Sequence, residues 1–520
     1  MTAARESFPA RRRDGILACG VAAALVALSI GCSHDATVSG SGGRSASGGS
    51  SGSGGNTGSG GSTGSGGAIA TGGSGGTTAS GGSGSGGTTA SGGSVGSGGS
   101  NSGGSNSGGT TATGGSVGSG GSNSGGSSSG GATGQGGAGG AAGGATASVT
   151  IPRGGRCTPP RRASTADVQA AYAKWKTDLL TADGAGPNSL RVRRPNSGDV
   201  LNGTVSEGIG YGMLIAVYLN DQPTFDKLWN YEQQFLDANG LMNWYIGPDH
   251  NVLGMGGATD GDEDMAFALL LADKRWGGMG SRSKTYLSEA ITLINAIWKY
   301  EIDHTRNDVP TPGDMGGGGG SVTNISYFAP AFYRAFGRAT GQQANWDRVV
   351  NTCYTVLAAT LNSANKNATS GLVPAWSTPA GVPMPRPNTS DPTHHQLDSC
   401  RTPFRLAQDY CWNNEPKALD YLKKISGFYQ MKGAKNILDG YNLDGTDHPG
   451  AASVGNQSAA FVGPAGVGAM ASPDFATLRD EAYDGVATLN QLAGSTYYNE
   501  SWTVLSLIMM TGLMDDLTLP

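Results

Sequence analysis

The sequence predicts an all-α fold for residues 153–520, in which about twelve helices form six hairpins arranged in a ring, an (α/α)6 barrel. Three observations lead to this prediction. Apolar residues recur with helical spacing from Arg153 onward, no segment alternates convincingly between apolar and polar residues, and the connecting stretches are rich in Gly, Pro, Asn and Asp. No sequence period of about 34 to 47 residues is visible, so a helical solenoid is the less favoured alternative.

The first helix is predicted to begin at Ser164-Thr165-Ala166-Asp167, because a hydroxyl residue followed by an acidic one is typical of a helix start. Helical spacing continues through VQAAYAKWKTDLL. The same periodicity predicts eleven further helices, at about 208–219, 223–237, 263–275, 283–302, 327–340, 343–364, 399–413, 415–430, 456–469, 473–489 and 498–514. Long loops are expected at 241–261, 303–325 and 365–397, and active-site residues commonly lie on such loops.

The charge of the chain argues against nucleic acid as a partner. The 520 residues include 34 Lys and Arg against 39 Asp and Glu, which gives a formal net charge of −5. A nucleic-acid-binding protein needs a basic surface to neutralise phosphates, and this composition does not supply one.

Residues 40–150 hold 48 of the 91 glycines, and no Lys, Arg, Asp or Glu lies between Arg44 and Arg153. Such a segment cannot bury enough apolar surface to offset its conformational entropy, so we expect a flexible Gly/Ser/Thr linker. Collagen is excluded because the glycines have no strict period of three and proline is scarce there.

The N-terminus is typical of an export signal. Arg5 and the triplet Arg11–Arg13 precede an apolar run of about 15 residues, which is short for a membrane span. The run ends in Leu28-Ser29-Ile30-Gly31-Cys32, which resembles the lipobox of bacterial lipoproteins and implies lipidation of Cys32 after cleavage. The alternative is an ordinary signal peptide in which Cys32 is incidental. We therefore expect a signal peptide at 1–31, a lipidated N-terminus and linker at 32–152, and a catalytic barrel at 153–520.

Four cysteines remain in the predicted barrel: Cys157, Cys353, Cys400 and Cys411. Cys400 and Cys411 are expected on one helix about 16 Å apart, whereas a disulfide needs Cα atoms within about 7 Å, so these two should not pair. The other pairings stay open. Neither a C-x-x-C nor an H-E-x-x-H motif is present, and the adjacent His394 and His395 are interpreted as loop residues, so no metal is predicted.

The first candidate motif is TVSEGIGYGM, residues 204–213, in which Glu207 stands at a predicted helix start before three alternate glycines. Glycines can let a ligand approach the backbone closely. A glutamate there can serve as a proton donor if burial raises its pKa. Equally, Glu207 can simply complement the helix dipole.

The second and third motifs are also rich in charge. ATDGDEDMAFALLLA, residues 258–272, places four acids within five residues, starting at Asp260, and its alternative interpretation is a solvated helix N-terminus. A calcium-binding loop is not predicted here, because the Glu that ends such a loop is missing.

In the third motif, DSCRTPFRLAQDY at residues 398–410, Asp398 precedes a helix on which Arg401 and Arg405 can hold carboxylates. By itself this pattern favours an N-cap with salt bridges.

Together the three motifs resemble glycoside hydrolase family 8 over nearly all of 155–516. The pattern A-[ST]-D-[AG]-D-x-x-[IM]-A is matched throughout 258–276, and S-E-G-x-G-Y-G-M and D-x-C-R-T-P-F-R occur in the expected order. The resemblance implies an (α/α)6 barrel that hydrolyses β-1,4 glycans with inversion. It implies Glu207 as general acid, Asp398 as general base and Asp260 as the residue that holds the sugar. Leu397 departs from the family, which usually has an aromatic residue before the base.

Inverting hydrolysis fits these residue types. A protonated carboxylic acid protonates the leaving oxygen while an ionised carboxylate activates water on the opposite ring face, with the two groups roughly 6.5–9.5 Å apart. Two carboxylates from different helix ends around one barrel mouth can supply that gap. Neither a metal nor a cofactor is required.

A polysaccharide also needs flat apolar platforms and polar contacts. The resemblance places substrate contacts at Trp244, Tyr327, Tyr497 and Tyr498; we add Tyr211, and Arg401, which can order the base or bind a sugar hydroxyl. Five other tryptophans fall within periodic helices and are expected in the core, namely Trp175, Trp229, Trp298, Trp346 and Trp502.

We therefore expect an exported, surface-tethered endo-β-1,4-glucanase, similar to cellulases, that acts as a monomer on a β-1,4-linked polysaccharide and meets the membrane only through its lipid anchor. The same barrel can instead carry chitosanase, xylanase or lichenase activity. Alternatives of other classes are a glycan-binding surface lipoprotein without catalysis and an adhesin or scaffold dominated by its tether. The three retained carboxylates count against the loss of catalysis.

Overall fold

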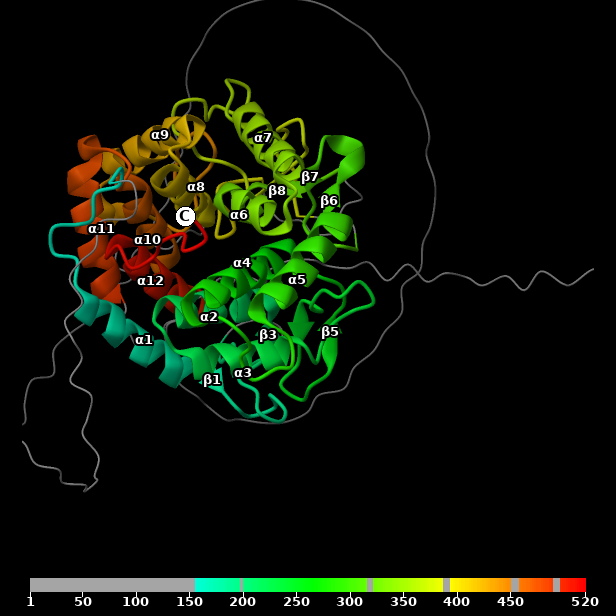
Figure 1. Ribbon diagram of the computed structural model, residues 1–520. Helices are drawn as coiled ribbons and strands as arrows, with labels where there is room; N and C mark the ends of the chain where they lie inside the picture. Colours follow the sequence, from blue (N-terminus) through cyan, green and yellow to red (C-terminus); the bar gives the residue numbers. More distant parts are fainter. Residues whose placement is uncertain (1–154, 197–199, 316–320, 387–392, 450–457, 490–495) are drawn as a thin grey trace, which may run out of the picture. The chain divides into compact units, whose positions relative to one another are not determined.

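The computed structural model describes residues 155–196, 200–315, 321–386, 393–449, 458–489 and 496–520 (Figure 1). Twelve α-helices lie in these ranges: α1 Thr165–Leu179, α2 Ser206–Tyr218, α3 Gln222–Glu232, α4 Thr259–Trp276, α5 Tyr286–Tyr300, α6 Pro330–Thr340, α7 Gln343–Thr360, α8 Thr402–Asn413, α9 Pro416–Lys432, α10 Ala459–Ala469, α11 Ala476–Leu489 and α12 Tyr497–Met510. Each coincides with a predicted helix, with shifts at the ends.

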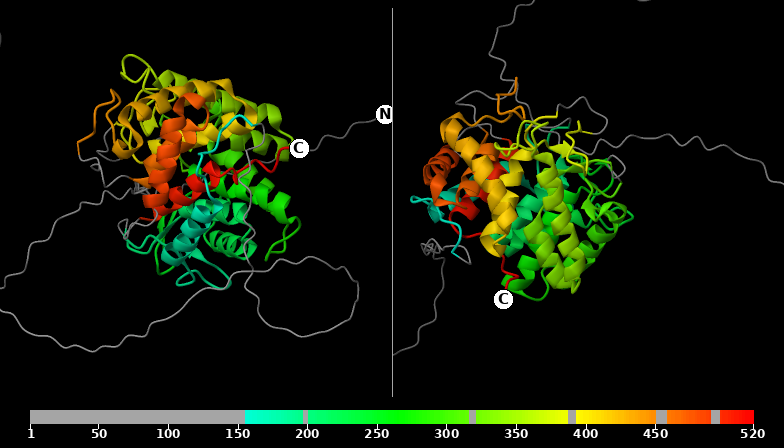
Figure 2. Two further views of the ribbon diagram at one scale, coloured as in Figure 1. Left: turned by 90° about the vertical axis from the view of Figure 1, so that its left-hand side faces the viewer. Right: turned by 90° about the horizontal axis from the view of Figure 1, so that it is seen from above.

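The helices form two concentric layers, which confirms the predicted (α/α)6 barrel. The even-numbered helices contact one another in sequence from α2 to α12, and α12 closes the inner ring against α2. Each odd-numbered helix packs outside an even-numbered one, so α1 lies on α12, α3 on α2, α5 on α4, α7 on α6, α9 on α8 and α11 on α10. Figures 1 and 2 show this arrangement of inner and outer helices.

Sequence composition explains which helices lie inside. All residues of α2 and α10, and all of α12 except Asn499, are buried, and the sequences of these helices are dominated by apolar and small residues. By contrast, α5 buries Tyr286, Glu289, Ala290, Leu293, Ile294 and Ile297, which follow the three- and four-residue spacing of a one-sided helix. A helix that is apolar all round needs neighbours on every side, whereas an amphipathic helix needs them on one side only.

Nine short strands join the loops in antiparallel pairs within the part of the chain described, although the sequence showed no convincing strand. They are β1 Leu180–Thr181 with β2 Arg191–Val192, β3 Thr204–Val205 with β4 Tyr245–Ile246 and β5 Val252–Gly254, β6 Ile302–Asp303 with β7 Val309–Pro310, and β8 Thr323–Asn324 with β9 Trp376–Ser377. Each has only two or three residues, too few for an alternating pattern to be visible.

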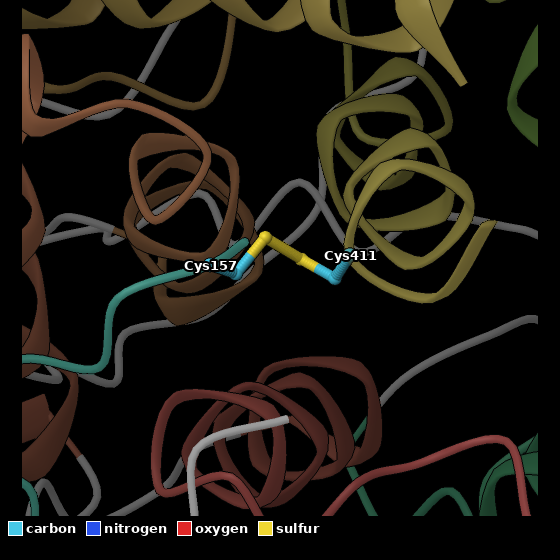
Figure 3. The surroundings of a disulfide bond; sticks show 2 residues. All are labelled: Cys157 and Cys411. Atoms are coloured by element: carbon cyan, nitrogen blue, oxygen red, sulfur yellow. A yellow bond between two sulfur atoms is a disulfide. The ribbon is translucent and has the colours of Figure 1, made fainter. Parts of the chain in front are cut away.

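A disulfide joins Cys157 to Cys411, with Cα atoms 5.4 Å apart across a sequence separation of 254 residues (Figure 3). It ties the segment before α1 to α8, while α1 itself packs on α12. Cys353 and Cys400 are free and buried, so Cys400 and Cys411 do not pair, as expected. None of the helices in the described ranges is long and apolar enough to cross a membrane.

We expect that replacing both Cys157 and Cys411 with serine lowers the free energy of unfolding by about 2–5 kcal/mol, because the bridge restricts a long loop in the unfolded chain. The measurement is urea unfolding of residues 153–520 with and without a thiol reductant. Reductant should destabilise the wild type and leave the double variant unchanged. Equal unfolding midpoints for oxidised and reduced wild type would contradict a structural role for the bridge.

Candidate active site

The three candidate carboxylates lie where inner-layer segments begin. Glu207 is in the first turn of α2, directly after β3, and Asp260 is in the first turn of α4. Asp398 precedes the short 3-10 helix η3, Ser399–Arg401, which runs into α8. All three side chains are buried. The barrel therefore brings together, at one mouth, groups that are up to about two hundred residues apart in the sequence.

Arg401 connects these carboxylates. Its Nη1 donates to Glu207 Oε1 at 2.5 Å and to Asp260 Oδ2 at 2.6 Å, while its Nη2 lies 3.7 Å from Asp398 Oδ1. The guanidinium is completely buried and lies over the ring of Tyr327, with its carbon 4.9 Å from the ring centroid. One fixed positive charge therefore serves three acidic groups.

Two tyrosines also hold Glu207. The Tyr211 hydroxyl donates to Oε1 at 2.9 Å, and the Tyr497 hydroxyl donates to Oε2 at 2.5 Å. Tyr211 is one turn further along α2, whereas Tyr497 opens α12. Both carboxylate oxygens are therefore fixed by donors from three elements of the barrel.

Gly210, the second of the three glycines after Glu207, allows a close contact between two helices. A Cβ atom at Gly210 would lie 2.8 Å from Asp264 Cβ, and one at Gly261 would lie 2.9 Å from the Glu207 nitrogen. These two positions let α2 and α4 pack closely, which holds Glu207 near Asp260. The other two glycines of the motif face residues outside α4.

Asp260 is fully buried, and this burial raises its pKa to about 7 against the opposing effect of Arg401. Its Oδ1 accepts a hydrogen bond from the Gly261 nitrogen at 2.9 Å. A carboxyl group with such a pKa can carry or release a proton near neutral pH.

Asp398 is held by two donors that the sequence did not identify. Trp376 Nε1 donates to Oδ2 at 3.1 Å, and Asn324 Nδ2 donates to the same oxygen at 3.4 Å. Both residues come from the β8–β9 ribbon, whose strands are too short to leave a sequence pattern. No motif in the sequence marks either position.

The predicted substrate-binding aromatics are all buried. Tyr211, Tyr327 and Tyr497 lie around Arg401 and Glu207. The Tyr498 hydroxyl donates to the Leu397 carbonyl at 3.0 Å. Trp244 is 8% exposed and stacks on Tyr245, and its carbonyl accepts from the Ser206 nitrogen beside Glu207.

Of the five tryptophans expected in the core, Trp175, Trp229, Trp346 and Trp502 are buried, and Trp298 is partly buried against them.

Cys32 and the predicted boundaries at 31 and 152 lie outside the described residues.

The other acids of the second motif are buried, so its interpretation as a solvated helix end was wrong. Helix α4 begins at Thr259, four residues earlier than expected, which takes the whole acidic run into the helix. Asp264 pairs with Arg405 at 2.6 Å, and Glu263 accepts from the Tyr333 hydroxyl at 2.8 Å. Arg405 thus holds a carboxylate, as the third motif suggested.

Asp262 belongs to a separate group of three buried carboxyls with Glu232 and Glu301. Burial raises the pKa of all three, to about 8 for Glu232, and the carboxyls raise the pKa values of Asp262 and Glu301 further by mutual repulsion. Among the residues that the structure describes, no set of three or more His, Cys, Asp or Glu is arranged to hold a metal ion.

Comparison with known proteins gives a consistent result. The model of the family described as Glycosyl hydrolases family 8 matches residues 160–512. Endoglucanase A of Acetivibrio thermocellus is 36% identical over 352 residues, which cover 67% of this chain and 69% of that protein. Endoglucanase 2 of Ruminiclostridium josui is 37% identical over 348 residues, covering 66% of this chain and 71% of that protein.

Solved structures show the same fold. The apo beta-1,3-1,4-glucanase from Paenibacillus sp. X4 superimposes with a TM-score of 0.63 at 29% identity, covering 70% of this chain and 97% of that one. Rex8A from Paenibacillus barcinonensis, in complex with xylose, has a TM-score of 0.55 at 19% identity, covering 67% of this chain and 92% of that one. At that identity the second likeness concerns the fold alone.

Because burial raises the pKa of the carboxyls of Glu232, Asp262 and Glu301 in the folded protein, we expect the free energy of unfolding to fall as pH rises. In the unfolded chain a glutamate ionises near pH 4.3, whereas folded Glu232 keeps its proton until about pH 8. Between these values the folded state binds more protons than the unfolded state. The contribution of Glu232 to the free energy of unfolding is therefore fully present below about pH 4.3 and is lost as the pH rises to about 8. We expect Tm to fall between pH 5 and pH 8.5 in differential scanning calorimetry.

The matched variant is Glu232→Gln, which keeps the shape and cannot ionise. Its Tm should depend less steeply on pH than that of the wild type. An identical slope for both proteins would show that Glu232 does not titrate in this range.

Proposed function

The chain belongs to glycosyl hydrolases family 8, whose members are inverting glycoside hydrolases, and we propose that it is an endoglucanase that cleaves internal β-1,4 bonds of a cellulose-like glucan. The observation that carries the proposal is the arrangement of Glu207, Asp260 and Asp398 around Arg401 at one barrel mouth. The comparisons support the proposal, because the two relatives at 36% and 37% identity are named endoglucanases.

In the proposed mechanism Glu207 is the general acid and Asp398 the general base. Glu207 protonates the leaving glycosidic oxygen while Asp398 takes a proton from water, which attacks the anomeric carbon from the opposite face. The bond to the leaving oxygen breaks as the bond to water forms, and the anomeric configuration inverts. The two carboxylates approach different nitrogens of Arg401, Nη1 for Glu207 and Nη2 for Asp398, so one guanidinium lies between the proposed acid and the proposed base in this network.

Glu207 and Asp260 share the Nη1 donor of Arg401. Burial and the neighbouring Glu207 carboxylate raise the pKa of Asp260 to about 7 against the opposing effect of Arg401, so Asp260 can hold a proton near neutral pH. Sugar hydroxyls that donate to Asp260 would favour its ionised form.

The proposed glycan contacts combine apolar faces with polar ends. Trp244, which is 8% exposed and whose carbonyl accepts from the Ser206 nitrogen next to Glu207, would pack against the C–H face of a sugar ring. Arg401, the ring of Tyr327 and the hydroxyls of Tyr211 and Tyr497 would line the cleavage position, with the ring of Tyr498 in contact with that of Tyr211.

A mixed-linkage β-glucan is the second candidate substrate, favoured by the likeness to the Paenibacillus beta-1,3-1,4-glucanase at 29% identity. Xylan and chitosan remain alternatives on the same barrel, and xylan-acting proteins occur among the relatives. Leu397 lacks the aromatic ring usual before the base, which would alter the contact around the attacking water and leave the base itself in place.

We also propose export with anchoring through a lipidated Cys32, a long linker at 32–152 and a catalytic barrel from 153 onward, acting as a monomer. The disulfide between Cys157 and Cys411 supports export, because such bonds persist in oxidising compartments. A flexible tether would let the barrel reach an insoluble polymer in any orientation.

We expect the isolated segment 153–520 to release reducing sugar from carboxymethylcellulose and lichenan faster than from xylan or chitosan. Glu207→Gln and Asp398→Asn should each lower this rate about 10²-fold or more, because each removes one of the two proton transfers. The measurement is reducing-sugar release together with NMR of the first products, which should carry the α configuration.

Both variants should still bind the glucan in affinity electrophoresis and should keep the wild-type circular dichroism spectrum. Near wild-type turnover in either variant would contradict its role. Faster release from xylan or chitosan would contradict the proposed glucan substrate without bearing on the proposed roles of Glu207 and Asp398.

For the anchor, Cys32→Ser in the full-length chain should move the protein from the membrane fraction to the soluble or extracellular fraction, because it removes the lipidated residue. The measurement is immunoblotting of cell fractions, with Cys353→Ala as a control that leaves the proposed anchor intact. A distribution unchanged by Cys32→Ser would overturn the lipoprotein proposal.

A further inference from the structure

The β8–β9 ribbon places two hydrogen-bond donors on one oxygen of Asp398. Asn324 and Trp376 are direct partners across the antiparallel ribbon. Trp376 Nε1 reaches Asp398 Oδ2 at 3.1 Å, and Asn324 Nδ2 reaches the same atom at 3.4 Å. A cross-strand pair thus converges on a carboxylate that belongs to a different segment of the chain.

Trp376 is fixed in place and does not offer a platform to a sugar. Its side chain is buried to 1% exposure in a small apolar cluster with Val322, Ala375 and the partly buried Met384. The backbone is held on both sides, since its carbonyl accepts from the Met384 nitrogen at 2.9 Å and Ile325 donates to the Ala375 carbonyl at 3.2 Å. A fixed indole can orient the group to which it donates.

Asn324 is oriented by its other end. Its Oδ1 accepts from the Ser326 nitrogen at 3.0 Å and from the Ser326 hydroxyl at 2.7 Å, which turns Nδ2 toward Asp398. Ser326 Oγ in turn accepts from Arg401 Nε at 3.2 Å. The ribbon and the arginine are therefore parts of one hydrogen-bonded network around Asp398.

Asp398 lies farther from the Arg401 guanidinium than the other two carboxylates do. The guanidinium lies 2.5 Å from Glu207 and 2.6 Å from Asp260, but 3.7 Å from Asp398. Neutral donors matter more where a cation is more distant. An indole N–H can donate but cannot accept, so it always favours the ionised carboxylate over the protonated one.

We propose that Trp376 is a positioning residue for the reaction: with Asn324 as second donor, its indole N–H fixes the plane of the Asp398 carboxylate and keeps it ionised for water activation. The inference rests on the proposed role of Asp398 as general base. Trp376 acts through Asp398 and does not itself contact the substrate or the attacking water.

The test is Trp376→Phe, which removes the N–H and keeps an aromatic ring. We expect kcat to fall about 10- to 100-fold with KM within about twofold, because substrate binding is untouched while the base is misplaced. The acidic limb of the kcat/KM profile against pH should move to higher pH, because a hydrogen bond donated to a carboxylate favours its ionised form and the variant lacks that donor.

Trp412→Phe is the matched control. Trp412 is also buried, in α8, and its Nε1 has no hydrogen-bond partner among the described residues. The same chemical change there should leave kcat and the pH profile unaltered. Equal effects in the two variants would mean that loss of indole bulk, and not of the hydrogen bond, is responsible, and would overturn the proposal.

Asn324→Ala gives a second route to the answer if Trp376→Phe does not fold. It removes the other donor and should shift the acidic limb in the same direction. An unshifted profile in a folded Trp376→Phe protein, or in Asn324→Ala where that alone folds, would overturn the inference. Asp398→Asn separates this from the proposed function: turnover that survives Asp398→Asn removes the base assignment itself, whereas an inactive Asp398→Asn with an unaffected Trp376→Phe removes only the positioning role.

Discussion

A buried arginine surrounded by carboxylates is the interaction on which the rest of the site depends. Arg401 is completely inaccessible and lies within hydrogen-bonding distance of Glu207 and Asp260, with Asp398 farther away at 3.7 Å. Removing such a cation would leave several charges buried without compensation, which is far more costly than losing a surface ion pair. Burial still raises the pKa of Asp260 to about 7, so this carboxyl can carry a proton near neutral pH despite the arginine beside it.

The barrel is built to bring these groups together. Inner helices begin at the mouth, and the long connections between helices, with their two-residue strands and 3-10 turns, bring side chains from distant segments to one place. The contact of α2 with α4 shows how tightly this is done, since side chains at Gly210 or Gly261 would push the two helices apart and with them Glu207 and Asp260. The packing of the inner helices therefore also fixes the geometry of the site.

The sequence could predict the fold because each helix is long enough to show its periodicity, from Thr165–Leu179 to Tyr497–Met510. It also supplied the three carboxylates and Arg401, because their motifs are local. It could not supply Trp376 and Asn324, which lie on strands of two residues, nor the pairing of Cys157 with Cys411 across 254 residues. The solvated interpretation of the second motif failed because local charge density says nothing about whether Arg405 and Tyr333 come to meet it.

Opposite tendencies act on the carboxylates at this mouth, and their balance is what inverting hydrolysis needs. Position in the first turn of a helix favours the ionised form through the helix dipole, whereas complete burial favours the protonated form. Asp260 experiences both, and burial prevails enough to raise its pKa to about 7. Asp398 instead precedes a short 3-10 turn and accepts two neutral hydrogen bonds from the β8–β9 ribbon. Carboxylates in one site can therefore differ in how readily they hold a proton, because different elements surround them.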